Sequence, residues 1–164
     1  MKLYILRHAE AADRDPKKFP EDALRPRLKK GKKNTLKVAR TLKKDNSKID
    51  LILSSSSLRA LDGARIIRKA LKLKKDKLVE VDALLPEGNN STLIAEIKEK
   101  YKVDSLLLVG HNPNLTLLIS QLLAGSPDLP IRLRKGGLCK LSIDELTDGK
   151  CAVLEFLTEP SIVD

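Results

Sequence analysis

The chain has 164 residues, of which 41% are hydrophobic and 33% charged, as is typical of one globular domain that buries its own core. We expect a single domain over residues 1–164, located in the cytoplasm, because no apolar stretch is long enough to cross a bilayer and the amino-terminal apolar run is too short for a secretory signal. Lys and Arg outnumber Asp and Glu by 32 to 22, and the formal net charge of +10 predicts an anionic partner: a phosphorylated molecule, an acidic protein or nucleic acid.

Nucleic acid is the partner that the composition favours least. The chain has two Tyr, two Phe and no Trp, so it lacks the aromatic platforms on which single strands stack. It carries no helix-turn-helix, zinc-finger or RNA-recognition signature. Cys139 and Cys151 are the only cysteines, and with two histidines they fit no known zinc-ligand spacing. We therefore expect reduced cysteines and no metal.

Short apolar runs alternate with amphipathic stretches along the chain. The apolar runs predict strands at residues 3–6, 49–53, 78–81 and 105–109. Apolar residues at helical spacing predict helices over 32–44 (from Leu36, Ala39 and Leu42), from about 58, over 91–101 and after 113. Serines at 54–57 are expected to cap the second helix. Residues 11–27, with three prolines, and 84–90 are expected to be loops, and residues 138–143 and 151–157 an antiparallel hairpin.

This alternation predicts an α/β fold with three layers, α/β/α, around a mainly parallel sheet that ends in the carboxyl-terminal antiparallel hairpin. Right-handed crossovers place the carboxyl ends of all parallel strands at one edge of the sheet. Arg7 and His8 follow the first strand, Arg59 follows the second and His111 follows the fourth. Both histidines of the chain thus come directly after strands, and we expect them to meet.

Two arginines and two imidazoles form a set suited to phosphoryl groups. The guanidinium fork matches phosphate oxygens and stays charged at any working pH. A neutral imidazole can attack phosphorus and form a covalent phosphohistidine, since the ordinary pKa of histidine lies near neutrality. Backbone N–H groups at the start of the helix near Leu58 would add donors. The alternative is that both histidines only fill polar niches at strand ends, but the accompanying arginines favour a binding site.

Four short motifs resemble those of the histidine phosphatase (phosphoglycerate mutase-like) superfamily, and the resemblance extends over the chain from residue 3 to about 157. Arg7-His8-Ala9 resembles its RHG/RHA motif, and residues 55–60 resemble its Ser-Pro-x-x-Arg-Ala turn. Residues 110–113, Gly-His-Asn-Pro, resemble its second-histidine motif, and residues 25–31 its Arg-Pro-Leu-Thr-x-x-Gly segment. In its small size and in its Gly-His-Asn-Pro motif, the chain resembles the SixA-like phosphohistidine phosphatase branch.

The resemblance implies a role for each motif residue. His8 would be the nucleophile, transiently phosphorylated and then hydrolysed by water. Arg7, Arg59 and His111 would bind the phosphoryl oxygens, and His111 would also stabilise the transition state. Arg25 is a candidate peripheral phosphate contact, or else an exposed loop arginine. No metal or organic cofactor is needed, because the arginines neutralise the charge that Mg²⁺ neutralises elsewhere.

The proton donor separates the candidate substrates. Larger members carry a general acid in the region that matches residues 84–90, where Glu87 is the only carboxylate; it is a candidate acid or else a solvated turn residue. Without a strong acid, alcohol leaving groups react slowly, whereas the nitrogen of a phosphoramidate protonates readily. We therefore expect a protein phosphohistidine phosphatase. The alternatives are a phosphatase of small or sugar phosphate monoesters with the same mechanism, and a non-catalytic module that binds through its basic face.

Overall fold

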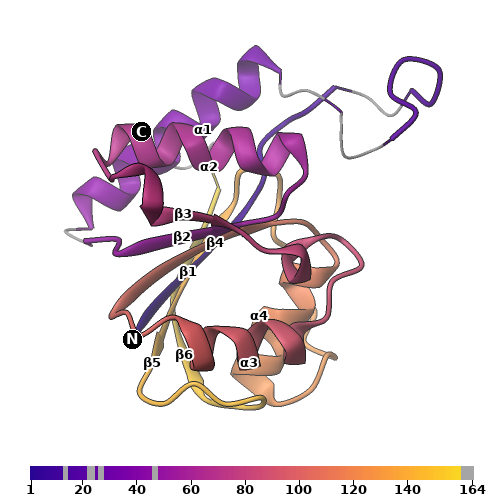
Figure 1. Cartoon of the computed structure of the whole chain (residues 1–164). Helices are drawn as coiled ribbons and strands as arrows, with labels where there is room; N and C mark the ends of the chain where they lie inside the picture. Colours follow the sequence, from indigo (N-terminus) through magenta and orange to yellow (C-terminus); the bar gives the residue numbers. More distant parts are fainter. Residues whose placement is uncertain (13–14, 22–24, 26–27, 46–47, 160–164) are drawn as a thin grey trace.

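The protein is a three-layer α/β/α sandwich, seen in a computed structural model that describes residues 1–12, 15–21, 25, 28–45 and 48–159 (Figure 1). Within these ranges the sheet has six strands in the order β3-β2-β4-β1-β5-β6. Their bounds are β1 Lys2–Arg7, β2 Leu51–Ser54, β3 Leu78–Glu80, β4 Ser105–Gly110, β5 Leu138–Ile143 and β6 Ala152–Thr158. Strands β1 to β4 are parallel, and β5 and β6 add an antiparallel hairpin beside β1. The predicted fold class is confirmed.

Helices cover both faces of the sheet. Helices α1 (Lys29–Lys44) and α2 (Leu58–Ala70) lie on one face, and α3 (Asn90–Lys100) and α4 (Asn114–Ala124) lie on the other (Figure 1). Two short 3-10 turns, η2 (Lys75–Lys77) and η3 (Asp82–Leu84), flank β3. Among the described helices, none has both the length and the apolar character that crossing a membrane requires.

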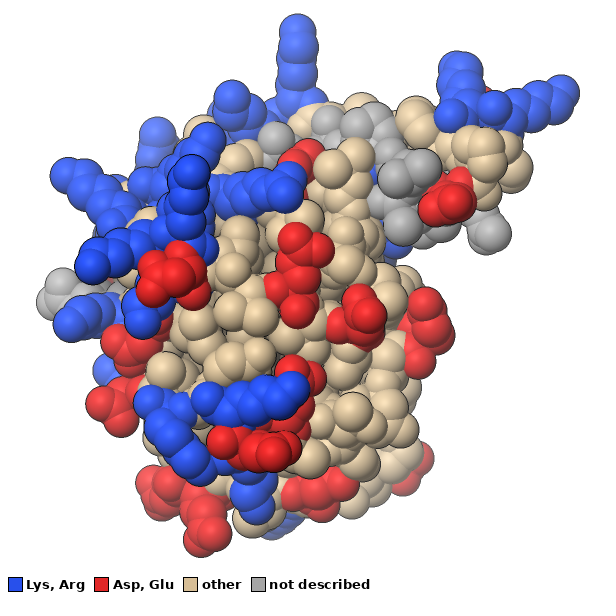
Figure 2. Space-filling view, viewed as in Figure 1, with Lys and Arg blue, Asp and Glu red and all other residues tan. Residues whose placement is uncertain are grey.

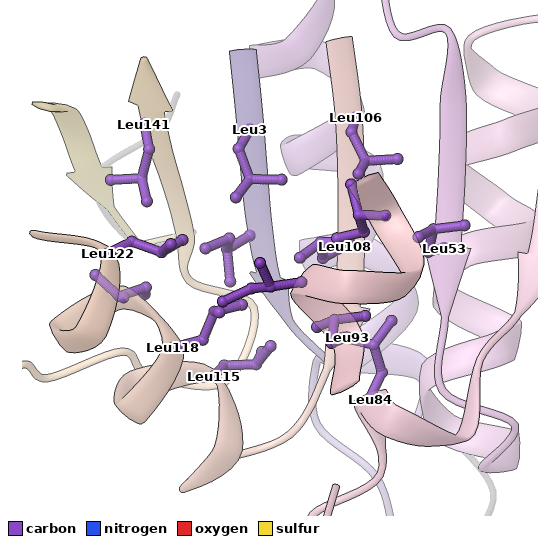
Figure 3. Close-up of a cluster of buried hydrophobic side chains, with 14 of the residues drawn as sticks. Leu3, Leu53, Leu84, Leu93, Leu106, Leu108, Leu115, Leu118, Leu122 and Leu141 are labelled. Atoms are coloured by element: carbon purple, nitrogen blue, oxygen red, sulfur yellow. The ribbon is translucent and has the colours of Figure 1, made fainter. Parts of the chain in front are cut away.

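Successive side chains of the central strands point to opposite faces of the sheet and pack into two separate hydrophobic cores. In β1, Leu3 and Ile5 pack toward α3 and α4, where leucines of the strands and of both helices interdigitate (Figure 3). Tyr4 and Leu6 point the opposite way, toward α1 and α2. Strand β4 divides its side chains in the same manner. A parallel strand covered on both faces needs a continuous apolar run, which is why the β1 and β4 sequences read as uninterrupted rather than alternating.

The register of the parallel strands brings their last residues to one level. Arg7 of β1 lies opposite Gly110 of β4, and Ser54 of β2 lies opposite Val109. Strand β4 sits between β1 and β2, so the segments that follow these three strands leave the sheet side by side. The residues that follow each strand therefore share one edge, as the crossover rule predicts.

Some local predictions need correction. Leu36, expected on the inner stripe of α1, is 38% exposed, because the buried face is formed by Gly31, Thr35, Val38, Ala39 and Leu42 and the helix turns Leu36 away from it. Helix α1 also begins at Lys29, three residues before the predicted start. Both cysteines are free, as expected, and burial raises the pKa of Cys139 to about 12. In the predicted loop 11–27, the described residues contain only a bridge at Ala11 and a turn over 16–18.

Candidate active site

Backbone hydrogen bonds fix the segments after β1, β2 and β4 to one another. The His8 N–H donates to the Gly110 carbonyl at 3.1 Å, and the Ser55 N–H donates to the Val109 carbonyl at 2.9 Å. These bonds extend the parallel ladder by one residue beyond β1 and β2. The functional side chains therefore start from backbone held by the sheet, which limits their movement.

The ring of His8 is held in one tautomer. It is 7% exposed, and its Nδ1 lies 2.7 Å from the carbonyl oxygen of Ala9. A carbonyl oxygen can only accept a hydrogen bond, so Nδ1 carries the proton. In the neutral ring, Nε2 then keeps its lone pair. Nε2 faces the guanidinium of Arg59, whose Nε donates to it at 3.3 Å.

The surroundings of His8 keep its imidazole neutral. The pKa of His8 is lowered from 6.5 to about 4, chiefly by burial and in addition by the positive charges of Arg59, Arg7 and Lys135, against the opposing effect of the Ala9 carbonyl. At neutral pH the ring is therefore unprotonated. A buried, neutral imidazole whose unprotonated nitrogen lies beside an arginine can act as a nucleophile toward an anion that the arginine binds.

Arg59 reaches this point because it lies in the first turn of α2, directly after the turn that leaves β2. It is 4% exposed, which is rare for an unpaired arginine and common for one that binds an anion or a buried partner. The serines before it do not cap α2 as predicted. Ser57 is the N-cap residue, but its side chain makes no capping bond, and its N–H instead donates to Ser55 Oγ at 3.2 Å.

His111 completes the cluster from the end of β4. It is 2% exposed, and its ring centroid lies 4.9 Å from that of His8, with an angle of 53° between the ring planes. Its Nε2 is hydrogen-bonded to Ser55 Oγ at 2.9 Å. Ser55 thus connects the turn before α2 to the second histidine. Sequence reasoning gave Ser55 only a capping role and missed this contact, although its position in the serine-rich turn was the available signal.

Arg7 occupies the border between the buried histidines and the surface. Its Nη1 donates to the carbonyl of Leu133 at 3.0 Å, and the side-chain amide of Asn112 donates to the same carbonyl at 3.0 Å. Burial lowers the pKa of Arg7. Its Nε is also buried, and in the described part of the chain no group accepts a hydrogen bond from it. A buried guanidinium donor of this kind suits an anionic ligand.

The two peripheral candidates have different surroundings. Arg25 donates through Nη1 to the carbonyl of Ala12 at 3.0 Å, within the loop after β1, and the neighbouring Pro26 and Arg27 of that motif fall outside the described residues. Glu87 is exposed and lines a surface pocket formed by the start of α3 and by α4. His8, Arg7, Arg59 and His111 do not line that pocket.

A cavity of about 600 Å³ opens beside Arg7. It is bordered by α1 and by the loop between α4 and β5, and we call it the basic groove. Its lining residues are Arg7, Glu10, Lys30, Lys33, Asn34, Lys37, Arg134, Lys135 and Glu159. Sequence reasoning did not predict this groove. Within the described ranges, no group of three or more His, Cys, Asp or Glu side chains is arranged to hold a metal ion.

No protein-family model matches the chain. A relative, an uncharacterized protein of Picosynechococcus sp. strain PCC 7002, is 32% identical over 143 residues, which cover 86% of this chain and 84% of the relative. Among solved structures, the protein histidine phosphatase SixA complexed with tungstate superposes with a TM-score of 0.84 at 23% identity over 100% of both chains.

Two further structures extend the likeness. The putative phosphohistidine phosphatase SixA of Agrobacterium tumefaciens has a TM-score of 0.77 at 25% identity over 97% of both chains. A putative alpha-ribazole-5'-P phosphatase of Escherichia coli has a TM-score of 0.74 at 17% identity over 98% of this chain and 97% of the other. Motifs and fold agree over the whole length, and the chain has the fold of the histidine phosphatase superfamily and is similar to its SixA proteins.

Proposed function

We propose that this phosphatase removes phosphoryl groups from phosphohistidine side chains of proteins through a covalent intermediate on His8. One observation carries the proposal: His8 is held neutral, with Nδ1–H bonded to the Ala9 carbonyl and Nε2 directed at Arg59. This is the protonation state that a nucleophile needs, in contact with a group that binds a phosphoryl oxygen.

In the first step the lone pair of His8 Nε2 attacks phosphorus, and the bond between phosphorus and the substrate imidazole breaks. The bonding pair goes to the substrate nitrogen. If the other ring nitrogen of the substrate is protonated, the imidazole leaves as a neutral molecule. Arg59, Arg7 and His111 bind the phosphoryl oxygens as charge develops on them. One phosphorus–nitrogen bond replaces another of the same kind, so the step needs no strong general acid.

In the second step water attacks the phosphorus of phospho-His8. The phosphorus–Nε2 bond breaks and returns its electron pair to Nε2, while the water proton passes to the released phosphate or to solvent. The Ala9 carbonyl still accepts the Nδ1 hydrogen bond, so His8 is restored in its original tautomer. Each cycle consumes one water and releases one phosphate.

Two features favour a protein substrate over a small phosphate ester. Glu87, the carboxylate expected as the acid for an alcohol leaving group, lines a different pocket from Arg7. The chain also has no large insertion between Arg59 and His111 that would enclose a small molecule. The competing function, hydrolysis of small phosphate monoesters, has the likeness to the alpha-ribazole-5'-P phosphatase in its favour.

A substrate panel with a trapping step tests the proposal. Purified protein is given a phosphohistidine peptide, sugar phosphates and nucleotide monophosphates, and acid-labile phosphate on the protein is mapped by mass spectrometry after rapid quenching at alkaline pH. We expect the highest kcat/KM for the phosphohistidine peptide and phosphate on His8. In His8→Asn, the Asn amide can still donate to the Ala9 carbonyl, but the nucleophilic nitrogen is lost, so turnover and trapped phosphate should both disappear.

Each alternative has its own outcome. Faster hydrolysis of the monoesters would replace the proposed substrate class, and full turnover by His8→Asn would exclude the proposed nucleophile. Salt-dependent nucleic-acid binding without hydrolysis of any compound in the panel would support a binding module instead.

A further inference from the structure

The basic groove carries more positive charge than its position beside the phosphate site requires. Six of its nine lining residues are cationic and two are anionic. Lys and Arg side chains gather over the half of the molecule formed by α1 and α2, whereas acidic side chains are more frequent over the half that holds α3 and α4 (Figure 2). A ligand of this groove would therefore have to be strongly acidic.

Both walls of the groove are attached to the end of β1. On one side, the Gly136 N–H donates to the carbonyls of Arg7 at 3.0 Å and His8 at 3.2 Å, which holds the preceding Arg134 and Lys135 beside the nucleophile. On the other side, the Asn34 amide donates to both carboxylate oxygens of Glu10, at 2.9 and 3.1 Å. These hydrogen bonds therefore fix the position of both groove walls relative to His8.

The acidic side chains of the groove already have partners. Glu10 binds Asn34 and lies 3.7 Å from the ammonium of Lys30, and Glu159 pairs with Arg134 at 3.1 Å. The positive excess therefore comes from the lysines, above all from those on α1. Lys30, Lys33 and Lys37 occupy positions i, i+3 and i+7, so they form one stripe along about 10 Å of helix.

We propose that the basic groove binds an acidic segment of the substrate protein next to its phosphohistidine. The inference rests on the proposed function, because it supplies the substrate with a second point of attachment. A stripe of two helical turns extends further than the second phosphate of a small metabolite can reach. Lysines are also compact charges on flexible stems, which suit carboxylates at variable positions better than one planar group. Lys135 links the groove to His8 electrostatically.

The test compares two peptides that carry phosphohistidine and differ only in their flanks, Asp and Glu in one and Asn and Gln in the other. The variant Lys33→Glu/Lys37→Glu reverses the stripe. The control Lys32→Glu/Lys43→Glu makes the same charge change on the same helix, at two exposed positions that do not line the groove. Direct binding of a fluorescent, unphosphorylated acidic peptide is measured by anisotropy in parallel, at low and high salt.

We expect the stripe variant to raise KM for the acidic peptide, and to weaken anisotropy binding, by about tenfold, with kcat and the KM of the neutral peptide unchanged. In the wild type, high salt should remove the difference in KM between the acidic and the neutral peptide. The control should behave as the wild type. Equal KM values for the two peptides in the wild type, or an equal loss in the control, would overturn the groove as a docking site.

Failure of the proposed function has a different signature. If neither peptide is hydrolysed while small monoesters are, the protein substrate is excluded, and the anisotropy measurement still decides the groove. Loss of acidic-peptide binding in the stripe variant alone would then support the groove. Binding that is equal in the stripe variant and the wild type would refute it.

Discussion

Replacing His8 by Asn should make the protein less sensitive to acid. Folding lowers the pKa of His8 from 6.5 to about 4, chiefly through burial. Between these pH values the unfolded chain binds more protons at this site than the folded chain, so the free energy of unfolding falls as the pH falls below 6.5. At pH 7 the imidazole is neutral in the folded state and mostly neutral in the unfolded state, and the penalty is nearly absent.

The size of the effect follows from the difference between 6.5 and about 4, which corresponds to about 3 kcal/mol when the ring is fully protonated in both states. At pH 4.5 about 2 kcal/mol of this penalty has already developed. His8→Asn keeps a donor for the Ala9 carbonyl and has no group that titrates there. Its free energy of unfolding should therefore fall by about 2 kcal/mol less than that of the wild type between pH 7 and pH 4.5.

Urea unfolding, followed by circular dichroism at several pH values, measures this difference. The variant will have its own stability at pH 7, so the quantity to compare is the change with pH in each protein. Carboxylates that titrate in the same range contribute equally to both proteins and cancel. Parallel stability curves for wild type and variant would refute the reasoning, because they would mean that burial does not keep His8 neutral.

Three further predictions concern catalysis. The acid limb of kcat/KM should lie near the lowered pKa of about 4 of His8 rather than near 6.5, after correction for substrate ionisation; a limb near 6.5 would contradict a buried neutral nucleophile. Arg59→Lys keeps a positive charge but loses the Nε contact with His8 and the guanidinium fork, so kcat/KM should fall by about 10²–10³ with an unchanged circular dichroism spectrum. Ser55→Ala removes the hydrogen bond to His111 and should lower kcat by about tenfold while Ser55→Thr retains most activity; equal kcat values for Ala and wild type would show that the bond does not position the ring.

The hydrophobic pattern by itself determined the layered α/β fold. A strand that is buried on both faces has a continuous apolar sequence, whereas an amphipathic helix has apolar residues every three or four positions. Strands β1 and β4 were recognisable for that reason. The rule on crossover handedness then placed Arg7, His8, Arg59 and His111 at one edge. These inferences succeed because they depend only on the local periodicity of apolar residues and on the handedness of the connections between strands. Neither depends on contacts between residues far apart in the chain.

Other properties were decided only by tertiary structure, because they depend on contacts between residues far apart in the chain. The lowered pKa of His8 results chiefly from burial by surrounding elements and in addition from charges such as that of Arg59, which is distant in sequence. The link from Ser55 to His111 joins residues that are 56 positions apart. The basic groove needs α1 and the loop before β5 to approach the same strand end. The sequence around a lysine on an amphipathic helix does not indicate which residues will lie opposite it, and only the folded chain showed that this stripe borders Arg7 at the end of β1.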